Sequence, residues 1–110
     1  MDDAERLLRR LALNDEESVD RVLVGAATLQ PEAGLDQKMD LLVRLGALLS
    51  LGAATASLRS TVARAIAAGA SESEIVDVLV SVAPAIGLAR VVAQAPRLAH
   101  ALGYDIGDDE

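Results

Sequence analysis

The sequence predicts an all-α fold, a compact bundle of about six helices. Ala, Leu, Val and Ile supply most of the apolar residues, because the chain is 52% hydrophobic but only 1% aromatic. Ala and Leu are strong helix formers, and small side chains let helices approach closely. Residues typical of helix caps and helix ends separate the apolar stretches. The 110 residues are expected to form a single domain, 1–110.

Two helices are expected in the N-terminal third. The first covers residues 3–13, and its apolar face consists of Leu7, Leu8 and Leu11. Asn14 is expected to cap the second helix, with Glu17 three residues later as in a capping box. Pro31 and Gly34 end this segment. The apolar face of the second helix is formed by Val19, Val22, Leu23 and Ala26.

The third helix is expected over residues 37–51, with Asp36 as its cap and Gly52 as its C-terminal stop. It is apolar almost all round, which is typical of a central helix or of one in a subunit interface. Thr55 or Ser57 begins a fourth helix that is expected to end at Gly69. Helical spacing places four residues of this helix on one apolar stripe: Leu58, Val62, Ala65 and Ile66.

The last third contains two more expected helices. Ser71 and Glu74 form a capping box, which predicts a fifth helix to about residue 83. Its buried face is formed by Ile75, Val78, Leu79 and Val82. Pro84 and Gly87 are expected to break the chain before a last helix over residues 88–102. Pro96 is expected to kink or split that helix.

The charge of the chain excludes some classes of partner. The formal net charge is −7, whereas nucleic acids and anionic membranes are bound through basic surfaces. Neither is an expected partner. The N-terminus has acidic residues where a secretory signal would have basic ones. Residues 41–54, the longest mostly apolar stretch, are too few to span a bilayer. A cytoplasmic location is therefore expected.

The inventory of reactive side chains is short. The chain has no Cys, one His (His100) and one Tyr (Tyr104). Thiol redox chemistry and cysteine-ligated metal sites are therefore excluded. Neither a metal site nor a cofactor is expected, and there is no Gly-rich phosphate loop.

Residues 35–102 resemble the carboxymuconolactone decarboxylase family, which includes alkyl hydroperoxidase D. Individually the motifs consist mostly of Ala, Leu and Gly, and their order and spacing carry the resemblance. The matching segments are LDQK at 35–38, LVRLGAL at 42–48, LGA at 51–53, LRSTV at 58–62, AGAS at 68–71, EIV at 74–76 and VAPAIGLAR at 82–90. The resemblance implies an all-α fold and assembly into homotrimers or homohexamers. Self-assembly also suits an aromatic-poor chain, since its core buries less area per residue.

The resemblance also identifies the positions of the family's reactive residues. Its peroxidases carry Cys-x-x-Cys followed four residues later by His, and the matching positions here are Ala54, Ser57 and Thr61. Its lactone decarboxylases place a His at the position of Thr61. An acidic residue of the preceding helix matches Leu41, with Asp40 beside it. Peroxide reduction needs a thiolate, and Thr is a poor substitute for an imidazole in proton transfer.

Arg44, Arg59 and Thr61 are the candidate ligand-binding residues. Arg44 is the only charged residue in the apolar stretch 41–51 of the third helix, and it could hold an anion bidentately. The structural alternative is an ion pair at a subunit contact or a side chain that extends to solvent. Arg59 fits an anion site or a solvated helix face. Thr61, with Ser57 one turn away, fits a polar pocket lining or an ordinary surface hydroxyl.

Three interpretations of function follow. The leading one is a cytoplasmic homo-oligomer without conventional catalysis, which acts as a scaffold or binds a small anionic ligand. The alternative is a decarboxylase or isomerase acting on a small anionic lactone or aromatic-derived substrate. In it, Arg44 or Arg59 would orient the carboxylate and Asp40 or His100 would move protons. That alternative requires a closed pocket between the third and fourth helices. The third is a purely structural or partner-binding module.

Overall fold

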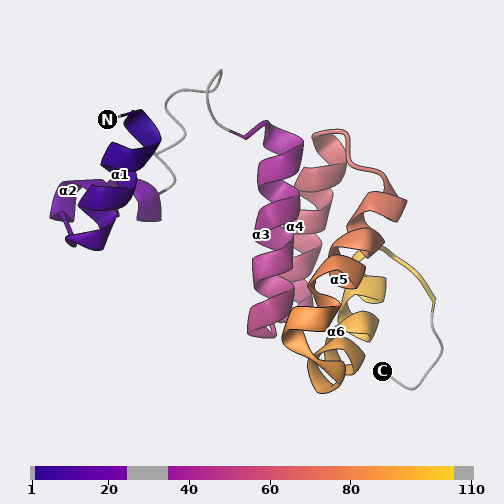
Figure 1. Cartoon of the computed structure of the whole chain (residues 1–110). Coiled ribbons are helices and arrows are strands. Elements are labelled where there is room, and N and C mark those ends of the chain that lie inside the picture. Colours follow the sequence, from indigo (N-terminus) through magenta and orange to yellow (C-terminus); the bar gives the residue numbers. More distant parts are fainter. Residues whose placement is uncertain (1, 25–34, 106–110) are drawn as a thin grey trace. The chain divides into compact units, whose positions relative to one another are not determined.

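The computed structural model describes residues 2–24 and 35–105 (Figure 1). These residues form six α-helices and no strand, which confirms the all-α prediction. The chain divides into two compact units, Met1–Gly34 and Leu35–Glu110. Each unit is described by itself below, and the single domain over 1–110 stays a prediction.

The N-terminal unit contains α1 (Asp3–Ala12) and α2 (Glu16–Leu23). The Asp2 carboxylate caps α1 by accepting the Glu5 N–H at 2.7 Å. No residue of α1 is buried, so its leucine face has no core to cover it within this unit. The predictions for Gly25, Ala26, Pro31 and Gly34 lie outside the described residues.

The predicted cap of α2 was wrong by one residue. Asn14 has a φ of 59° and forms the corner between α1 and α2, a left-handed conformation that Asn tolerates. Asp15 is the cap instead, and its carboxylate accepts the Ser18 N–H at 3.1 Å and the Ser18 hydroxyl at 2.6 Å. Glu17 pairs with Arg21 at 2.8 Å rather than completing a capping box.

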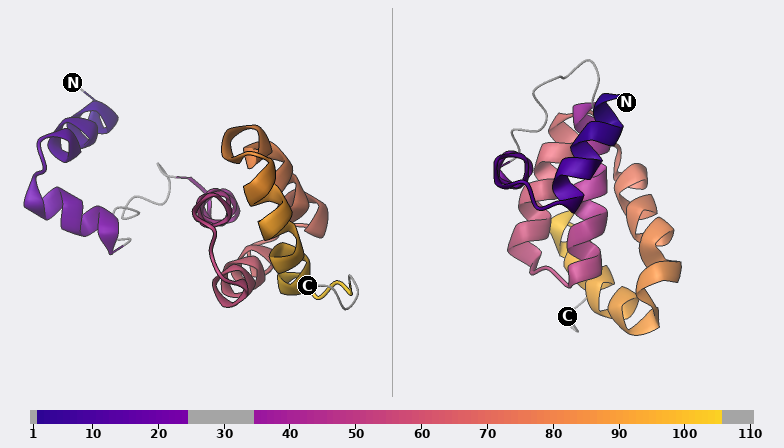
Figure 2. Two further views of the ribbon diagram at one scale, coloured as in Figure 1. Left: turned by 90° about the horizontal axis from the view of Figure 1, so that it is seen from below. Right: turned by 60° about the vertical axis from the view of Figure 1, so that its left-hand side comes forward.

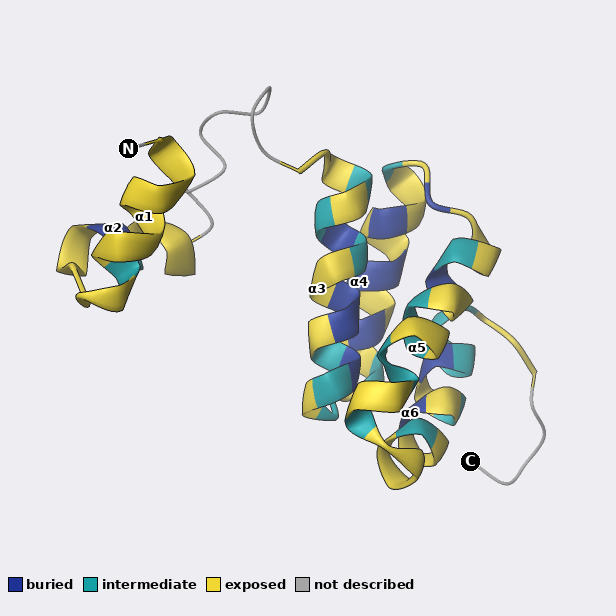
Figure 3. Cartoon of the chain, in the orientation of Figure 1, coloured by how far each residue is buried: buried dark blue, intermediate teal, exposed yellow. Residues whose placement is uncertain are grey.

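The second unit is a bundle of α3 (Gln37–Leu51), α4 (Thr55–Ala67), α5 (Glu72–Ile86) and α6 (Leu88–Ala101). Helix α3 packs against α4 and α5, and α6 completes the bundle against those two helices (Figure 2). The buried residues of these helices, dark blue in Figure 3, belong to a single apolar core. Its members are Leu41, Leu45, Leu49, Leu58, Val62, Ala65, Ala70, Ile75 and Leu98.

Local capping fixes the ends of α3 as predicted. The Asp36 carboxylate accepts the Met39 N–H at 2.8 Å, and Gly52 ends the helix with a φ of 76°. Helix α4 begins at Thr55 without a side-chain cap, and it ends two residues before Gly69. Ile66, predicted on the buried stripe, is 45% exposed because it lies at the edge of that stripe.

Both prolines of the last third lie inside helices. The Ser71–Glu74 capping box is confirmed, with hydrogen bonds of 3.0 and 2.9 Å. Helix α5 then continues through Pro84 to Ile86, so the predicted break at Pro84 was wrong. Proline leaves the carbonyl four residues earlier without its helical donor. That residue is the exposed Val80, where water can supply a donor. Pro96 likewise does not split α6.

A buried glutamine connects α6 to the turn between α3 and α4. Gln94 is 0% exposed, and its Nε2 donates to the Ala53 carbonyl at 3.3 Å. Arg97 Nη1 donates to Gln94 Oε1 at 3.1 Å and to the carbonyls of Gly52 and Ala53 at 3.1 and 3.2 Å. Every polar atom of the buried amide is therefore supplied with a partner, as a buried amide requires.

We expect Gln94→Ala to lower the free energy of unfolding by about 2 kcal/mol or more, because it leaves a cavity and removes two hydrogen bonds. Chemical denaturation measures this change. The matched control is Gln37→Ala, the same substitution at an exposed position, which should stay within about 0.5 kcal/mol of the wild type. Equal effects of the two substitutions would contradict a structural role for Gln94.

Candidate functional site

The positions that match the family's reactive residues have different surroundings. Leu41 is 1% exposed and belongs to the apolar core. Thr61 is 8% exposed on α4, whereas Ser57 one turn earlier is exposed. Ala54, the cap position of α4, is also exposed. A leucine that fills the core offers no proton donor or acceptor, so any chemistry here would depend on the Thr61 hydroxyl.

The candidate arginines lie on outer helix faces. Arg44 Nε pairs with Asp40 Oδ2 at 2.9 Å, one helical turn away on α3. Both side chains are partly exposed, and such pairs typically contribute only about 0.3–0.5 kcal/mol. Arg59 is exposed on α4. His100 lies half-buried on α6. Asp40, proposed with His100 as a proton carrier, is thus already engaged by Arg44.

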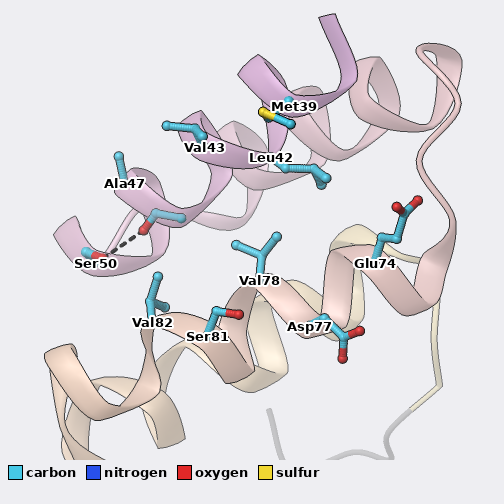
Figure 4. Close-up of a pocket in the computed structure, with 11 residues that line it drawn as sticks. Met39, Leu42, Val43, Ala47, Ser50, Glu74, Asp77, Val78, Ser81 and Val82 are labelled. Atoms are coloured by element: carbon cyan, nitrogen blue, oxygen red, sulfur yellow. Dashed lines mark hydrogen bonds between the residues drawn. The ribbon is translucent and has the colours of Figure 1, made fainter. Parts of the chain in front are cut away.

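An open groove of about 560 Å³ lies between α3 and α5 (Figure 4). Val78 and Val82 point from α5 toward α3, and Leu42 lies opposite them (Figure 4). The α3 side of the groove also includes Met39, Val43, Gly46, Ala47 and Ser50. The volume lies within the range of small-molecule sites, and the lining is mostly apolar.

Gly46 sets how closely α3 and α5 approach at the groove. A Cβ atom at this position would lie 3.4 Å from Val82 Cγ1 and 3.5 Å from Val78 Cγ1. A methyl group would therefore just fit, and any larger side chain would enter the groove. Ser50, one turn later, donates its hydroxyl to the Gly46 carbonyl at 2.8 Å. The small side chains of α3 thus form the floor on which an occupant would rest.

Acidic residues mark the α5 side of the groove. Glu74 Oε2 pairs with Lys38 Nζ at 3.0 Å, which joins the first turns of α3 and α5. Asp77 lies one turn further along α5, and its carboxylate points away from α3 (Figure 4). Within the described parts of the chain, the Asp77 carboxylate takes part in no ion pair or hydrogen bond. An anionic ligand in this groove would thus meet a carboxylate instead of a cation.

Hydrogen bonding holds the Glu74 carboxyl in its charged form. The backbone N–H of Ser71 and then the Lys38 ammonium lower the pKa of Glu74 below its ordinary value of 4.5. Ser18 similarly lowers the pKa of Asp15 through its side chain and backbone, at the cap of α2. Both shifts belong to helix caps, so they report on local structure rather than on a catalytic group.

The described residues contain neither a metal-binding cluster nor a membrane-spanning helix. In residues 2–24 and 35–105, no group of three or more His, Asp or Glu side chains could hold a metal ion. None of the helices in the same two stretches is long and apolar enough to cross a membrane.

The chain belongs to the carboxymuconolactone decarboxylase family, because the sequence profile of that family matches residues 16–101. The match begins in α2 and continues to the last residue of α6. It therefore starts earlier than residue 35, where the sequence motifs begin. No curated protein and no solved structure matches the chain.

Sequence reasoning did not identify the groove or the buried Gln94. The groove depends on how α3 and α5 meet, and the only local signal for it was Gly46 in the middle of a helix. A mid-helix glycine weakens a helix and often marks a close approach of another element. Gln94 lies among apolar residues of α6, but the carbonyl that it binds is in a distant turn.

We expect Glu74→Gln to flatten the pH dependence of stability. Glutamine keeps a capping side chain but has no carboxyl to titrate. Because the folded state lowers the pKa of Glu74, its contribution is complete above its ordinary pKa and is lost as pH falls through the folded value. Urea unfolding measured from neutral pH down through that range should show a smaller loss of stability for Glu74→Gln than for the wild type.

The control for this experiment is Lys38→Gln. It removes the ammonium but leaves the Ser71 N–H, the largest cause of the shift. This variant should keep most of the wild-type pH dependence. A Glu74→Gln profile that parallels the wild type would show that Glu74 does not couple protonation to folding.

Proposed function

We propose that this family member is a self-assembling scaffold that lacks both thiol peroxidase and histidine-dependent decarboxylase activity. The observation that supports it best is the exposed apolar surface of the second unit. Large apolar side chains there are open to solvent: Met39 and Val43, one turn apart on α3, are 49% and 58% exposed. Soluble monomers rarely expose many such residues together, whereas subunit interfaces cover them.

The reactive side chains support the non-catalytic part of the proposal. Thiol peroxidases attack peroxide with a thiolate, and the chain contains no Cys. The position of the family's acidic residue is occupied by the buried Leu41, and that of its histidine by Thr61. A threonine hydroxyl does not titrate near neutral pH, so it moves protons poorly.

The geometry gives less support to a decarboxylase or isomerase. That alternative needs a closed pocket between α3 and α4, but Leu41, Leu45 and Leu58 are buried in the core to which both helices contribute. The groove lies instead between α3 and α5, and neither Arg44 nor Arg59 lines it. A small anionic ligand would therefore find no candidate arginine inside the groove, and a scaffold role is favoured.

We expect native mass spectrometry of the purified protein to show a homo-oligomer, a hexamer or a trimer, with no additional mass on the subunits. Sedimentation velocity at several concentrations is the matching solution measurement. A monomer at all concentrations would contradict self-assembly. An extra mass on every subunit would support ligand binding instead, and its identification would give the ligand class.

We also expect that the protein does not accelerate the decarboxylation of carboxymuconolactone above its uncatalysed rate. Thr61→Ala should not alter that result, because Thr61 is proposed to have no catalytic role. Loss of carbon dioxide from the lactone, followed spectroscopically, is the measurement. Turnover by the wild type that disappears in Thr61→Ala would overturn the non-catalytic proposal.

A further inference from the structure

Helices α4 and α6 contain arginines but no carboxylate. Neither helix has an Asp or Glu, and between them they carry Arg59, Arg64, Arg90 and Arg97. The two helices pack against each other in the bundle. Because the formal net charge of the whole chain is −7, this pair of helices has the opposite sign of charge to the chain as a whole. The counter-charge for these arginines therefore comes from outside α4 and α6.

Two of these arginines meet at the turn between α3 and α4. Arg90 Nη1 lies beside Gly52, in the space that a side chain at this residue would take. Arg97 Nη1 donates to the carbonyls of Gly52 and Ala53 at 3.1 and 3.2 Å. The two guanidinium groups thus reach the same residue from positions about two helical turns apart on α6. Two cations that lie this close repel each other, and an anion bound by both would remove the repulsion.

Neither of these two arginines has an acidic partner. Among residues 2–24 and 35–105, no ion pair includes Arg90 or Arg97. Arg44 on α3, by contrast, is paired with Asp40. Arg90 and Arg97 are both exposed, so a ligand can reach their guanidinium groups from solvent.

A buried amide holds Arg97 in place. Gln94 is completely buried, and its Oε1 accepts from Arg97 Nη1 at 3.1 Å. Nη1 is thus shared by three acceptors. The Nε and Nη2 groups of Arg97 carry the other N–H donors, which have no acceptor in the described part of the chain. A guanidinium that is already fixed loses little freedom when it binds a ligand.

The start of α4 adds further donors beside the arginines. Helix α4 begins at Thr55, and the preceding Ala54 makes no side-chain cap. The first N–H groups of a helix have no acceptor within it, and the helix dipole favours an anion there. Ala54 directly follows Ala53, whose carbonyl binds Arg97. The helix start therefore supplements the two guanidinium groups.

We propose that Arg90 and Arg97 bind the phosphate group of a small molecule at the α3–α4 turn. A tetrahedral phosphate presents several oxygen atoms, so it can accept hydrogen bonds from two guanidinium groups at once. A single carboxylate is already satisfied by the two parallel hydrogen bonds of one arginine. The site is separate from the α3–α5 groove, because neither arginine lines that groove. It goes beyond the scaffold role and does not depend on self-assembly.

The charge of the chain favours a small ligand over a nucleic acid. A nucleic acid is bound through many phosphate contacts along a basic surface. Here two arginines converge at one turn, and a chain with a net charge of −7 repels a polyanion. The site therefore fits a single phosphate group.

The first test is a titration of the whole chain with inorganic phosphate, followed by NMR of the backbone amides. Sodium chloride at equal ionic strength is the reference. We expect the protein to lose phosphate from so open a site on buffer exchange, so that it enters the titration ligand-free. The amides of Gly52, Ala53 and Thr55 should then shift and saturate. A titration without saturation, or shifts confined to other residues, would overturn the inference.

The second test removes one guanidinium. Arg90→Gln should raise the dissociation constant of phosphate by about tenfold or more, because the charge-assisted hydrogen bonds of this side chain are lost. The matched control Arg64→Gln removes the same charge from an exposed position in the last turn of α4. It should bind phosphate within about twofold of the wild type, since salt screens a distant charge. Equal weakening by both substitutions would show general charge attraction and overturn the site.

Thermal unfolding gives a readout that needs no variant. Because phosphate would bind the folded state, it should raise the unfolding temperature of the wild type above that in chloride at equal ionic strength. The same unfolding temperature in both salts would contradict a phosphate site.

A short single-stranded oligonucleotide tests the other source of phosphate groups. We expect it to bind no more tightly than inorganic phosphate. Tighter binding that Arg64→Gln also weakens would identify a nucleic-acid surface and overturn the small-molecule site.

Discussion

The second unit depends on the packing of α3, which uses a different kind of side chain toward each neighbour. Leu41, Leu45 and Leu49 repeat every four residues and are almost completely buried. Each such leucine contributes roughly 1.5–3 kcal/mol by leaving water. Toward α5, by contrast, Gly46 presents no side chain, and Val78 and Val82 approach it closely. The large side chains thus fix the core, and Gly46, which has no side chain, creates the floor of the groove.

The turn after α3 is hydrogen-bonded to the last helix. Gly52 has a left-handed φ of 76°, a backbone conformation that residues with a side chain rarely adopt. Arg97 and the buried Gln94 bind the carbonyls of this turn from α6. A buried amide is costly unless its partners are fixed in place. The position of α6 and the conformation of the turn therefore stabilise one another.

Local signals explain which features the sequence could predict. The start of α3 was predicted because Asp36 hydrogen-bonds within its own first turn. Asn14 and Asp15 are both good caps in adjacent positions, so the pattern alone could not choose between them. Pro84 was expected to end a helix, but the exposed turn before it lets water replace the missing donor. The groove required the relative placement of α3 and α5, which no local pattern encodes.

The burial of Leu41 connects the loss of reactive groups with the proposed role. At 1% exposure, a carboxylate at this position would have to leave water, and burying a charge without a partner costs several kcal/mol. Leucine avoids that cost and completes the row of leucines toward α4. The inner face of α3 therefore serves stability, and its outer face, with Val43 and Arg44, is the part left to make contacts.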